Sequence, residues 1–386
     1  MTSPLPERIA EAVDGFEDEA GDAIELKDFT RDELHRLFEE GLDEPSFRGD
    51  QLFTWLYNHR AEAFEEMTNL SKDLRARLQD QARISPLEFN GAHESADGTT
   101  KLTFKCDGGS VVESVFIPSD GRNTLCISSQ VGCAMGCTFC YTAKMGLQRN
   151  LTTAEIVDQV VQARRKMTEE HGRIGNIVFM GMGEPLYNVD NVIRFIDILL
   201  DEQGLNFSRR KVTVSTSGVV PAIERLGEET DVQLAISLNA TTDETRSKIM
   251  PVNDRWGIDE LMETLRNYPL SNRERITFEY VLIKGVNDSL DDARRLMELT
   301  ADIPSKINLI PFNPHPKTPF ETPSEETMHA FQKFLVDHNV GVYRRRTRGR
   351  DEMAACGQLG EPGDGDEPPH VKKRLEKFRS QKIGRR

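Results

Sequence analysis

Hydrophobic residues in the first part of the chain recur with the period of an α-helix. Residues 30–41 (TRDELHRLFEEG) begin with a threonine and acidic residues, place three bulky apolar residues on one face, and end at a glycine. Threonine is a preferred N-cap and glycine a preferred terminator, so this segment predicts a helix. Residues 51–81 continue in the same manner. We therefore expect a helical accessory domain over residues 25–83.

Beyond residue 84 the pattern changes from helical to extended. Residues 84–120 contain two alternating stretches, KLTFKCD and SVVESVFI, separated by glycine-rich turns, which favour a small β-rich connecting segment. From residue 124 to 347, six or seven short apolar stretches alternate with amphipathic helical stretches. Strands that alternate with helices pair in parallel, so we predict an α/β fold, a partial (βα)6 barrel within a core domain of residues 121–360. In such barrels the site lies at the carboxyl ends of the strands, where this chain places GMGEP, STSG, SLNA and PFNP.

The two ends of the chain differ in charge. The 386 residues carry a formal net charge of −15, but residues 1–50 contribute −11 and residues 343–386 contribute +6. We predict that residues 1–24 form an acidic flexible segment and that residues 361–386 form a linker and a basic tail. As a single number the charge argues against nucleic acid as a partner, whereas its distribution leaves a basic region at the carboxyl end. No apolar run approaches the ~20 residues that span a bilayer, and no signal-peptide pattern is present, so we expect a cytoplasmic protein.

Three of the six cysteines, Cys133, Cys137 and Cys140, fall within eight residues. This C-x3-C-x2-C spacing follows the first strand of the predicted barrel, and clustered thiolates bind soft metals. A structural zinc site would need a fourth ligand, and no further cysteine or histidine lies close in sequence. A second alternative is three buried thiols without a role. The third is an iron–sulfur cluster held by three cysteines, with one iron left open for another ligand.

The cysteine spacing and the strand ends that follow it resemble the radical S-adenosylmethionine (SAM) superfamily. The resemblance implies a [4Fe-4S] cluster on Cys133, Cys137 and Cys140, whose open iron binds SAM and whose electron cleaves it to a 5′-deoxyadenosyl radical. It also assigns SAM contacts to residues at the strand ends: Gly183, Glu184, Ser215, Ser237, Leu238, Asn239 and Asn313. Taken singly, such motifs are more often turns, and an asparagine before proline is a common turn residue. Their order on successive strands makes the resemblance specific.

A narrower resemblance, to the RlmN-type dual-specificity RNA methyltransferases, runs from about residue 30 to residue 360. It rests on CISSQVGC, RNLT, GMGEPLYN, VSTSGVVP, INLIPFNP and the carboxyl-terminal ACGQL. The resemblance implies formation of 2-methyladenosine in the peptidyl-transferase region of 23S rRNA and in tRNA next to the anticodon, with two SAM molecules per turnover. A radical route suits this product because carbon 2 of adenine is electron-poor and offers no nucleophile for direct methyl transfer.

The same resemblance assigns roles to three further residues. One SAM methylates Cys356 on sulfur, and the carbon radical made from that methyl group adds to adenine carbon 2, which joins protein and RNA covalently. Glu113 is implied as the base that removes the carbon 2 proton. Cys126 is implied as the thiol that then attacks Cys356, which releases the methylated RNA and forms a disulfide.

Each assignment has a structural alternative. A cysteine in an apolar strand, such as Cys126, is more often a packing residue, and a glutamate in an alternating strand, such as Glu113, commonly lies on the outer face. The loop-like surroundings of Cys356 favour a reactive thiol, and Cys106 is expected to be structural. Asn239 departs from the family pattern, since many relatives carry a histidine there.

RNA contacts are expected from three basic segments, residues 208–211, residues 344–350 and the tail over 371–386. A solvated charged face is the alternative for each, and residues 344–350 are favoured because they lead to Cys356. The target base is expected to leave its stack to reach the site. The other expected partner is a reducing electron donor such as flavodoxin, and we expect a monomer without a membrane anchor. Two other functions stay open: a Cfr-like methyltransferase acting on adenine carbon 8, and a non-catalytic iron–sulfur and disulfide redox sensor, which would leave the strand-end motifs unexplained.

Overall fold

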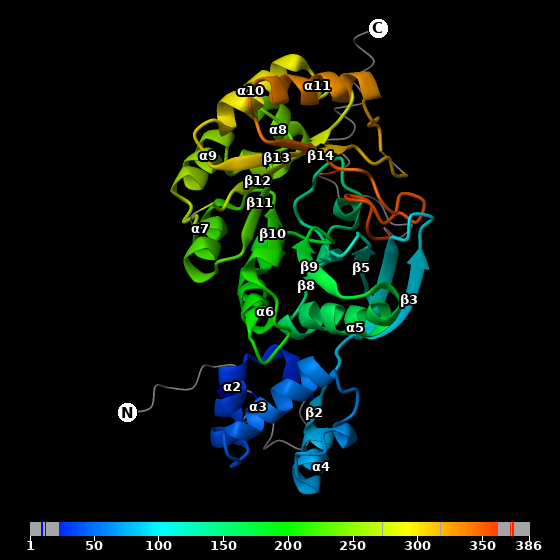
Figure 1. The fold of residues 1–386 in the computed structure, drawn as a ribbon, viewed down its shortest axis with the longest axis vertical. Helices are drawn as coiled ribbons and strands as arrows, with labels where there is room; N and C mark the ends of the chain where they lie inside the picture. Colours follow the sequence, from blue (N-terminus) through cyan, green and yellow to red (C-terminus); the bar gives the residue numbers. More distant parts are fainter. Residues whose placement is uncertain are drawn as a thin grey trace.

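One ten-stranded sheet organises the protein, with the strand order β14-β13-β12-β11-β10-β9-β6-β5-β4-β3 (Figure 1). The computed structural model describes residues 9, 10, 12, 23–271, 273–316, 318–361, 371 and 373. The predictions for an acidic segment and a basic tail therefore fall largely outside the described residues. The strands of the sheet are β3 (Glu88–Glu94), β4 (Thr100–Lys105), β5 (Val111–Ile117), β6 (Asn123–Ile127), β9 (Ile174–Phe179), β10 (Val212–Thr216), β11 (Gln233–Ser237), β12 (Ile276–Leu282), β13 (Ser305–Pro311) and β14 (Val342–Arg344).

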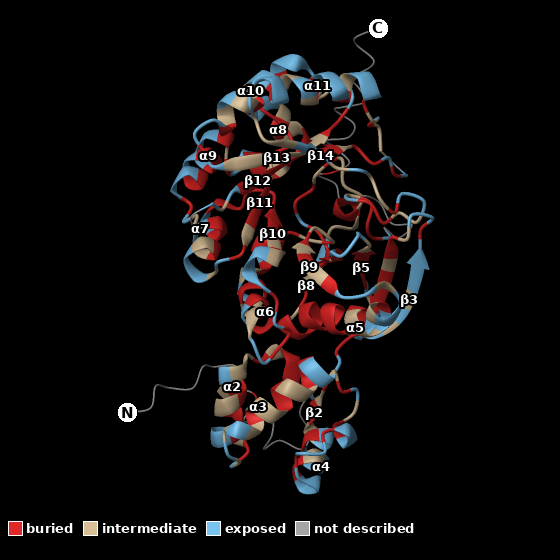
Figure 2. Ribbon diagram, viewed as in Figure 1, coloured by how far each residue is buried: buried red, intermediate tan, exposed pale blue. Residues whose placement is uncertain are grey.

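The strands from β6 to β14 along the sheet all run parallel, which confirms the predicted α/β class. β14 is short and is the seventh parallel strand, which the pattern of six or seven apolar stretches left open. The sheet ends in β3 and β14 and does not close, so the barrel is partial. The helices cover its outer side, and Figure 2 shows their exposed outer faces over a buried sheet. They are α5 (Thr153–His171), α6 (Val189–Leu200), α7 (Val220–Glu229), α8 (Asp243–Ile249), α9 (Ile258–Asn267), α10 (Leu290–Thr300) and α11 (Glu325–Asp337).

The β-rich segment between the helical domain and the barrel belongs to the same sheet. β4 pairs antiparallel with both β3 and β5, and β5 pairs antiparallel with β6, with Val115 opposite Cys126. β3 is the exposed edge strand (Figure 2). Because β5 lies beside the first parallel strand, residues of this segment can reach the site at the strand ends.

A small helical domain lies below the barrel in Figure 1. It contains α2 (Arg31–Arg36), α3 (Phe47–Thr54) and α4 (Lys72–Gln81), and its ends pair through β1 (Ile24–Glu25) and β2 (Ala82–Arg83). The predicted start at Thr30 is confirmed, because Thr30 and Glu33 form a capping box. A fully buried ion pair between Lys27 and Asp158 joins this domain to α5. Burial lowers the pKa of Lys27, which the neighbouring Asp158 carboxylate opposes.

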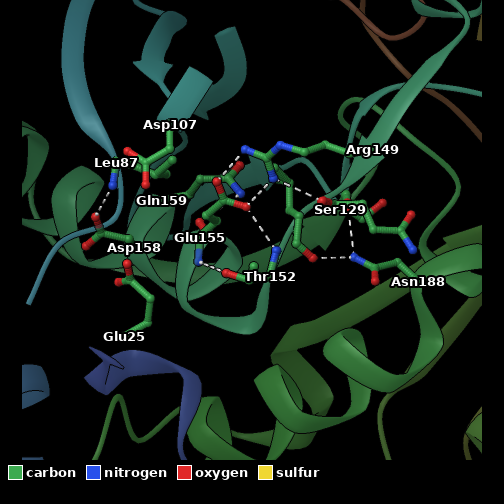
Figure 3. A network of polar contacts seen from close by, with 12 residues as sticks. Glu25, Leu87, Asp107, Ser129, Arg149, Thr152, Glu155, Asp158, Gln159 and Asn188 are labelled. Atoms are coloured by element: carbon green, nitrogen blue, oxygen red, sulfur yellow. Dashed lines mark hydrogen bonds and ion pairs between the residues drawn. The ribbon is translucent and has the colours of Figure 1, made fainter. Parts of the chain in front are cut away.

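A polar network at the amino end of α5 fixes this helix to the barrel (Figure 3). The Arg149 guanidinium donates to both carboxylate oxygens of Glu155, at 2.7 and 2.6 Å. Asn188 donates to the Ser129 carbonyl oxygen at 2.9 Å. Gln159 bonds the backbone N–H and carbonyl of the residue before Ser129, at 2.9 and 3.0 Å. The backbone between β6 and the cysteine loop is therefore held in place by two side chains, Asn188 and Gln159.

Candidate functional site

The cysteine loop leaves the sheet between two short antiparallel strands, β7 (Gln130–Gly132) and β8 (Leu147–Asn150). The backbone N–H of Cys133 donates to the Gly146 carbonyl oxygen at 2.9 Å. Gly132 has a φ of +76°, and a Cβ added there would lie 1.8 Å from the Gly146 oxygen. Only glycine fits at position 132, so this residue fixes the turn from which the cysteine loop starts.

A cavity at the carboxyl ends of the parallel strands gathers most of the predicted site residues. It encloses about 1020 Å³ of empty space, counted to its open mouth. Its lining includes the following residues singled out from the sequence: Cys133, Cys137, Cys140, Gly183, Glu184, Ser215, Ser237, Asn239, Asn313 and Cys356. Leu238 is fully buried but does not line the cavity, and its backbone N–H donates to the Glu279 carbonyl oxygen at 3.0 Å.

The surroundings of the three clustered thiols oppose their ionisation. Burial raises the pKa of Cys133, Cys137 and Cys140, and neighbouring thiols raise it further for Cys133 and Cys137. A cationic iron cluster would offset this penalty, because a coordinated thiol is deprotonated by the metal charge. In the described part of the chain, no three His, Cys, Asp or Glu side chains converge as one metal ion requires. Three thiols on one loop fit a multi-iron cluster bound through separate thiolates better than a structural zinc site, which needs four ligands.

Gly183 and Glu184 form a tight turn after β9. Gly183 has a φ of +100°, and an added Cβ would lie 2.6 Å from the Gln130 Cβ. The Glu184 carboxylate is buried and accepts the backbone N–H of Ser217 at 2.7 Å and of Leu186 at 3.1 Å. Burial raises the pKa of Glu184, while these hydrogen bonds oppose the rise. Glu184 thus joins the ends of two strands as well as lining the cavity.

The two asparagines at strand ends have defined structural partners. Asn239 has a φ of +56°, a conformation that asparagine tolerates better than most residues, and its Oδ1 accepts the Val281 N–H at 2.8 Å. Asn313 donates from Nδ2 to the Cys356 carbonyl oxygen at 3.1 Å, and its Oδ1 accepts the Thr347 hydroxyl at 2.9 Å. Asn313 is therefore bound to the loop that carries Cys356, a contact that sequence order did not reveal.

Cys356 lines both this first cavity and a second one. The second cavity encloses about 970 Å³ to its open mouth, and its lining includes Cys126, Cys356, Arg345, Arg346 and Arg348. Cys356 is exposed, whereas Cys126 is buried, and both are free thiols. The pKa of both thiols is raised: burial raises that of Cys126, the negative charge of Glu279 raises both, and the positive charge of Arg345 opposes the rise.

Glu279 is a site residue that the sequence analysis missed. It is the buried charged residue of β12, and its carboxylate lies 3.3 Å from the Arg345 guanidinium and accepts the Ser215 hydroxyl at 3.0 Å. A charge within the otherwise apolar strand ITFEYVL was the available signal, since buried charges require partners. Arg345, which we expect to meet RNA phosphates, also pairs with Glu279.

Glu113 is buried, so the alternative that it lies on the outer face is wrong. Its Oε2 accepts the backbone N–H of Gly360 at 2.7 Å, and the Lys101 ammonium lies 3.4 Å from Oε1. The antiparallel strand β5 thereby contacts the carboxyl end of the loop that carries Cys356.

The basic segments have different surroundings. Arg346 and Arg348 line the second cavity, whereas Arg344 pairs with Glu325 at 2.8 Å. In the segment 208–211, Arg209 pairs with Asp231 at 2.5 Å. Apart from residues 371 and 373, the basic tail is not described.

Comparisons with known proteins match both parts of the chain. Residues 24–84 match the family model described as "Ribosomal RNA large subunit methyltransferase N-terminal domain", and residues 127–298 match "Radical SAM superfamily". A "Dual-specificity RNA methyltransferase RlmN" of Pelobacter propionicus is 53% identical over 87% of this chain and 95% of its own length. The chain belongs to the RlmN family of radical SAM enzymes. The corresponding protein of Geobacter sulfurreducens is 51% identical over 92% of this chain and 96% of its own length.

A solved structure supports the family at the level of the fold. The radical SAM methyltransferase from Sphaerobacter thermophilus superposes with a TM-score of 0.83 at 44% identity, covering 87% of this chain and 99% of that chain. Membership of the RlmN family makes this protein an enzyme, and radical SAM enzymes use SAM with a [4Fe-4S] cluster. Among the described residues, none of the helices is both long and apolar enough to cross a bilayer.

Proposed function

We propose that this enzyme methylates carbon 2 of adenosine in 23S rRNA, and in tRNA next to the anticodon, through a methyl group carried on Cys356. The observation that supports the proposal most strongly is the position of Cys356 between two cavities. The three clustered cysteines line one of them, and Cys126 with three arginines lines the other. A thiol in this position can receive a group on one side and deliver it to a substrate on the other.

The first cavity suits the cluster and SAM. Cys133, Cys137 and Cys140 would hold the cluster, and the polar strand ends at Ser215 and Ser237 would contact SAM. Bound together, cluster and SAM supply the methyl group and the one-electron chemistry that activates it.

Cys356, Glu113 and Cys126 then act in sequence. Cys356 carries the methyl carbon on its sulfur, and once that carbon is joined to adenine carbon 2, Glu113 accepts the carbon 2 proton. The remaining unpaired electron must leave to a one-electron acceptor, a role that the cluster would supply. The Cys126 thiolate attacks the Cys356 sulfur, a sulfur–sulfur bond forms, and the bond from that sulfur to the methylene carbon breaks. The carbon keeps the electron pair and takes a proton from water, which completes the methyl group. Both thiols are thereby oxidised to a disulfide, and an external thiol reductant must restore them.

The second cavity suits an RNA substrate. Arg346 and Arg348 line it and can contact the phosphates that flank the target nucleotide, while the extruded base approaches Cys356. The net charge of −15 does not oppose this role, because most of it belongs to residues 1–50. An enzyme with this substrate works where ribosomal RNA and tRNA are found, in the cytoplasm.

Anaerobic incubation with SAM, a low-potential reductant and an rRNA fragment tests the proposal. Nucleoside mass spectrometry should find 2-methyladenosine, and 8-methyladenosine would instead establish the Cfr-like alternative. Cys356→Ala should abolish methylation but keep the cluster absorbance, and Cys126→Ala should accumulate a protein–RNA adduct. Cys106→Ala serves as the control, because Cys106 lines neither of these two cavities. Absence of any methylated nucleoside from cluster-loaded enzyme would overturn the proposal.

A further inference from the structure

Arg345 lies at the wall of the second cavity, which both reactive thiols, Cys126 and Cys356, also line. The Arg345 backbone N–H donates to the Leu309 carbonyl oxygen at 2.9 Å, which continues the pairing of β14 with β13. Its Nη1 lies 3.3 Å from the Glu279 carboxylate. The position of this charge is therefore set from two sides, by its own strand and by β12.

The ionisable groups around Arg345 favour its positive charge. Burial lowers the pKa of Arg345, but the negative charges of Cys356, Glu279 and Cys126 outweigh this effect and raise it overall. Arg344, the preceding residue, pairs with Glu325 at the surface. Arg344 and Arg345 thus have different surroundings, and of these two only Arg345 lines the cavity of the thiols.

We propose that Arg345 is a positioning residue that holds a fixed positive charge at the wall of the cavity of Cys126 and Cys356 and favours the thiolate form of the reacting thiol. The inference rests on the proposed function of these two cysteines. Thiolates, not thiols, are the nucleophiles both when Cys356 accepts a methyl group and when Cys126 attacks Cys356. Burial of Cys126 disfavours its anion, and the carboxylate of Glu279 disfavours the anion of both thiols, so a nearby cation that keeps its proton favours both steps.

Glu279 limits how far Arg345 favours the thiolates. Its carboxylate holds the Arg345 guanidinium in place, yet its own negative charge raises the pKa of both thiols. Cys140 is the remaining ionisable neighbour of Cys356, and its negative charge acts in the same direction as Glu279. Removing Arg345 and removing the Glu279 charge should therefore change thiolate formation at Cys356 in opposite directions.

The test measures alkylation of Cys356 by iodoacetamide between pH 6 and 10 in the cluster-loaded enzyme, without RNA. Peptide mass spectrometry follows the unmethylated fraction of Cys356, the exposed cysteine of the chain. Arg345→Gln should shift the midpoint of the alkylation profile up by about one pH unit, which makes alkylation about tenfold slower below the midpoint. Arg345→Lys should restore most of the rate, and Glu279→Gln should shift the midpoint down. Arg344→Gln is the matched control and should leave the profile unchanged.

An unchanged profile in Arg345→Gln, or one that Arg345→Lys does not restore, would overturn the inference. If Arg345→Gln does not fold, the downward shift in Glu279→Gln and the normal profile of Arg345→Lys still decide the question. Alkylation needs no RNA, so the two proposals can fail separately. Failure of RNA methylation would contradict the proposed function but would not change the alkylation result. With RNA, Arg345→Gln should accumulate the protein–RNA adduct at pH 7 and resolve it faster as pH rises.

Discussion

Asn313 donates a hydrogen bond from its side-chain nitrogen to the backbone carbonyl oxygen of Cys356, at 3.1 Å. The same side chain accepts the hydroxyl of Thr347 at 2.9 Å, so it bridges the start and the end of the loop that leads to the thiol. Family resemblance suggested a SAM contact for this residue. Its partners indicate a second task, which is to set the position of Cys356.

Asn313→Asp tests that task. The variant keeps an acceptor for Thr347 but presents an oxygen to the Cys356 carbonyl, so one hydrogen bond becomes a repulsion. A net loss of about 1–2 kcal/mol in loop placement should reduce the methylation rate about five- to thirtyfold. Hydrogen exchange should accelerate over residues 354–360, while Asn267→Asp on α9 should change neither measurement. A raised KM for SAM with unchanged exchange would show that Asn313 acts on SAM alone.

The hairpin between β3 and β4 anchors the other side of the same loop. Asp351 accepts the Ser95 hydroxyl and the Ala96 N–H, the latter at 3.0 Å, and Figure 1 shows the orange-red segment that includes this part of the chain near the tips of these strands. Asp351→Ala should accelerate hydrogen exchange over residues 349–356 severalfold, and Glu352→Ala, the adjacent acidic residue, should not.

The same anchor predicts a pH dependence with a definite sign. The hydrogen bond from Ser95, with that from Ala96, lowers the pKa of Asp351. A lowered pKa means that the anchor is fully present above the ordinary aspartate value of about 4 and is lost as pH falls through the lowered value. Loop exchange in the wild type, corrected for intrinsic rates, should therefore match Asp351→Ala only below about pH 4. Equal exchange rates in the wild type and Asp351→Ala near neutral pH would contradict the role of Asp351 as an anchor.

Glu113→Gln separates a base from an anchor. Glutamine can still accept the Gly360 N–H that Glu113 accepts at 2.7 Å, but it cannot take up a proton. If Glu113 removes the carbon 2 proton, Glu113→Gln should lower methylation about 10²-fold or more and accumulate adduct, with cluster content unchanged. Full activity in Glu113→Gln together with loss in Glu113→Ala would leave only the anchoring role. Glu94→Gln, on the exposed edge strand, is the control.

Gly132→Ala should impair cluster binding. Its added Cβ would lie 1.8 Å from the Gly146 oxygen, so β7, β8 or the cysteine loop must shift. Gly121 also has a positive φ, +71°, but an added Cβ there meets nothing within 4 Å. Gly121→Ala should therefore lose about 1 kcal/mol at most through backbone strain and keep its iron. Gly132→Ala should show a lower Tm and fewer iron atoms per protein, and equal iron in both variants would refute the role of this turn.

Arg346→Gln should weaken RNA binding. Arg346 is exposed and lines the second cavity, in contrast to the inward-facing Arg345. Loss of one phosphate contact should reduce the slope of log Kd against log salt concentration by about one. Arg266→Gln is the control and should leave the slope unchanged. Arg266 lies on α9 and pairs with Asp302, which follows α10. A full slope in Arg346→Gln would exclude a phosphate contact by this residue.

Much of the site could be predicted because its signals are local in sequence. The three clustered cysteines lie on one loop, and strand ends such as Ser215 and Ser237 meet because parallel strands end at the same edge of the sheet. Leu238 shows the limit of this reasoning, since a residue can occupy a strand end without lining the cavity. Arg345 shows it again, because spacing within an arginine run does not tell which side chain turns inward.

The sequence by itself determined the fold class, the clustering of the cysteines and the family, since periodicity and short-range spacing are properties of neighbouring residues. Only the tertiary structure decided which distant residues act together. Glu113 and Gly360 are 247 residues apart and share a hydrogen bond because β5 extends the barrel sheet beside β6. The same packing brings Cys126 on β6 to the cavity wall that Cys356 reaches from the other end of the core domain. Chain order records neither the direction of a side chain nor the path of a loop, and these two properties place the reactive thiols and the charges around them.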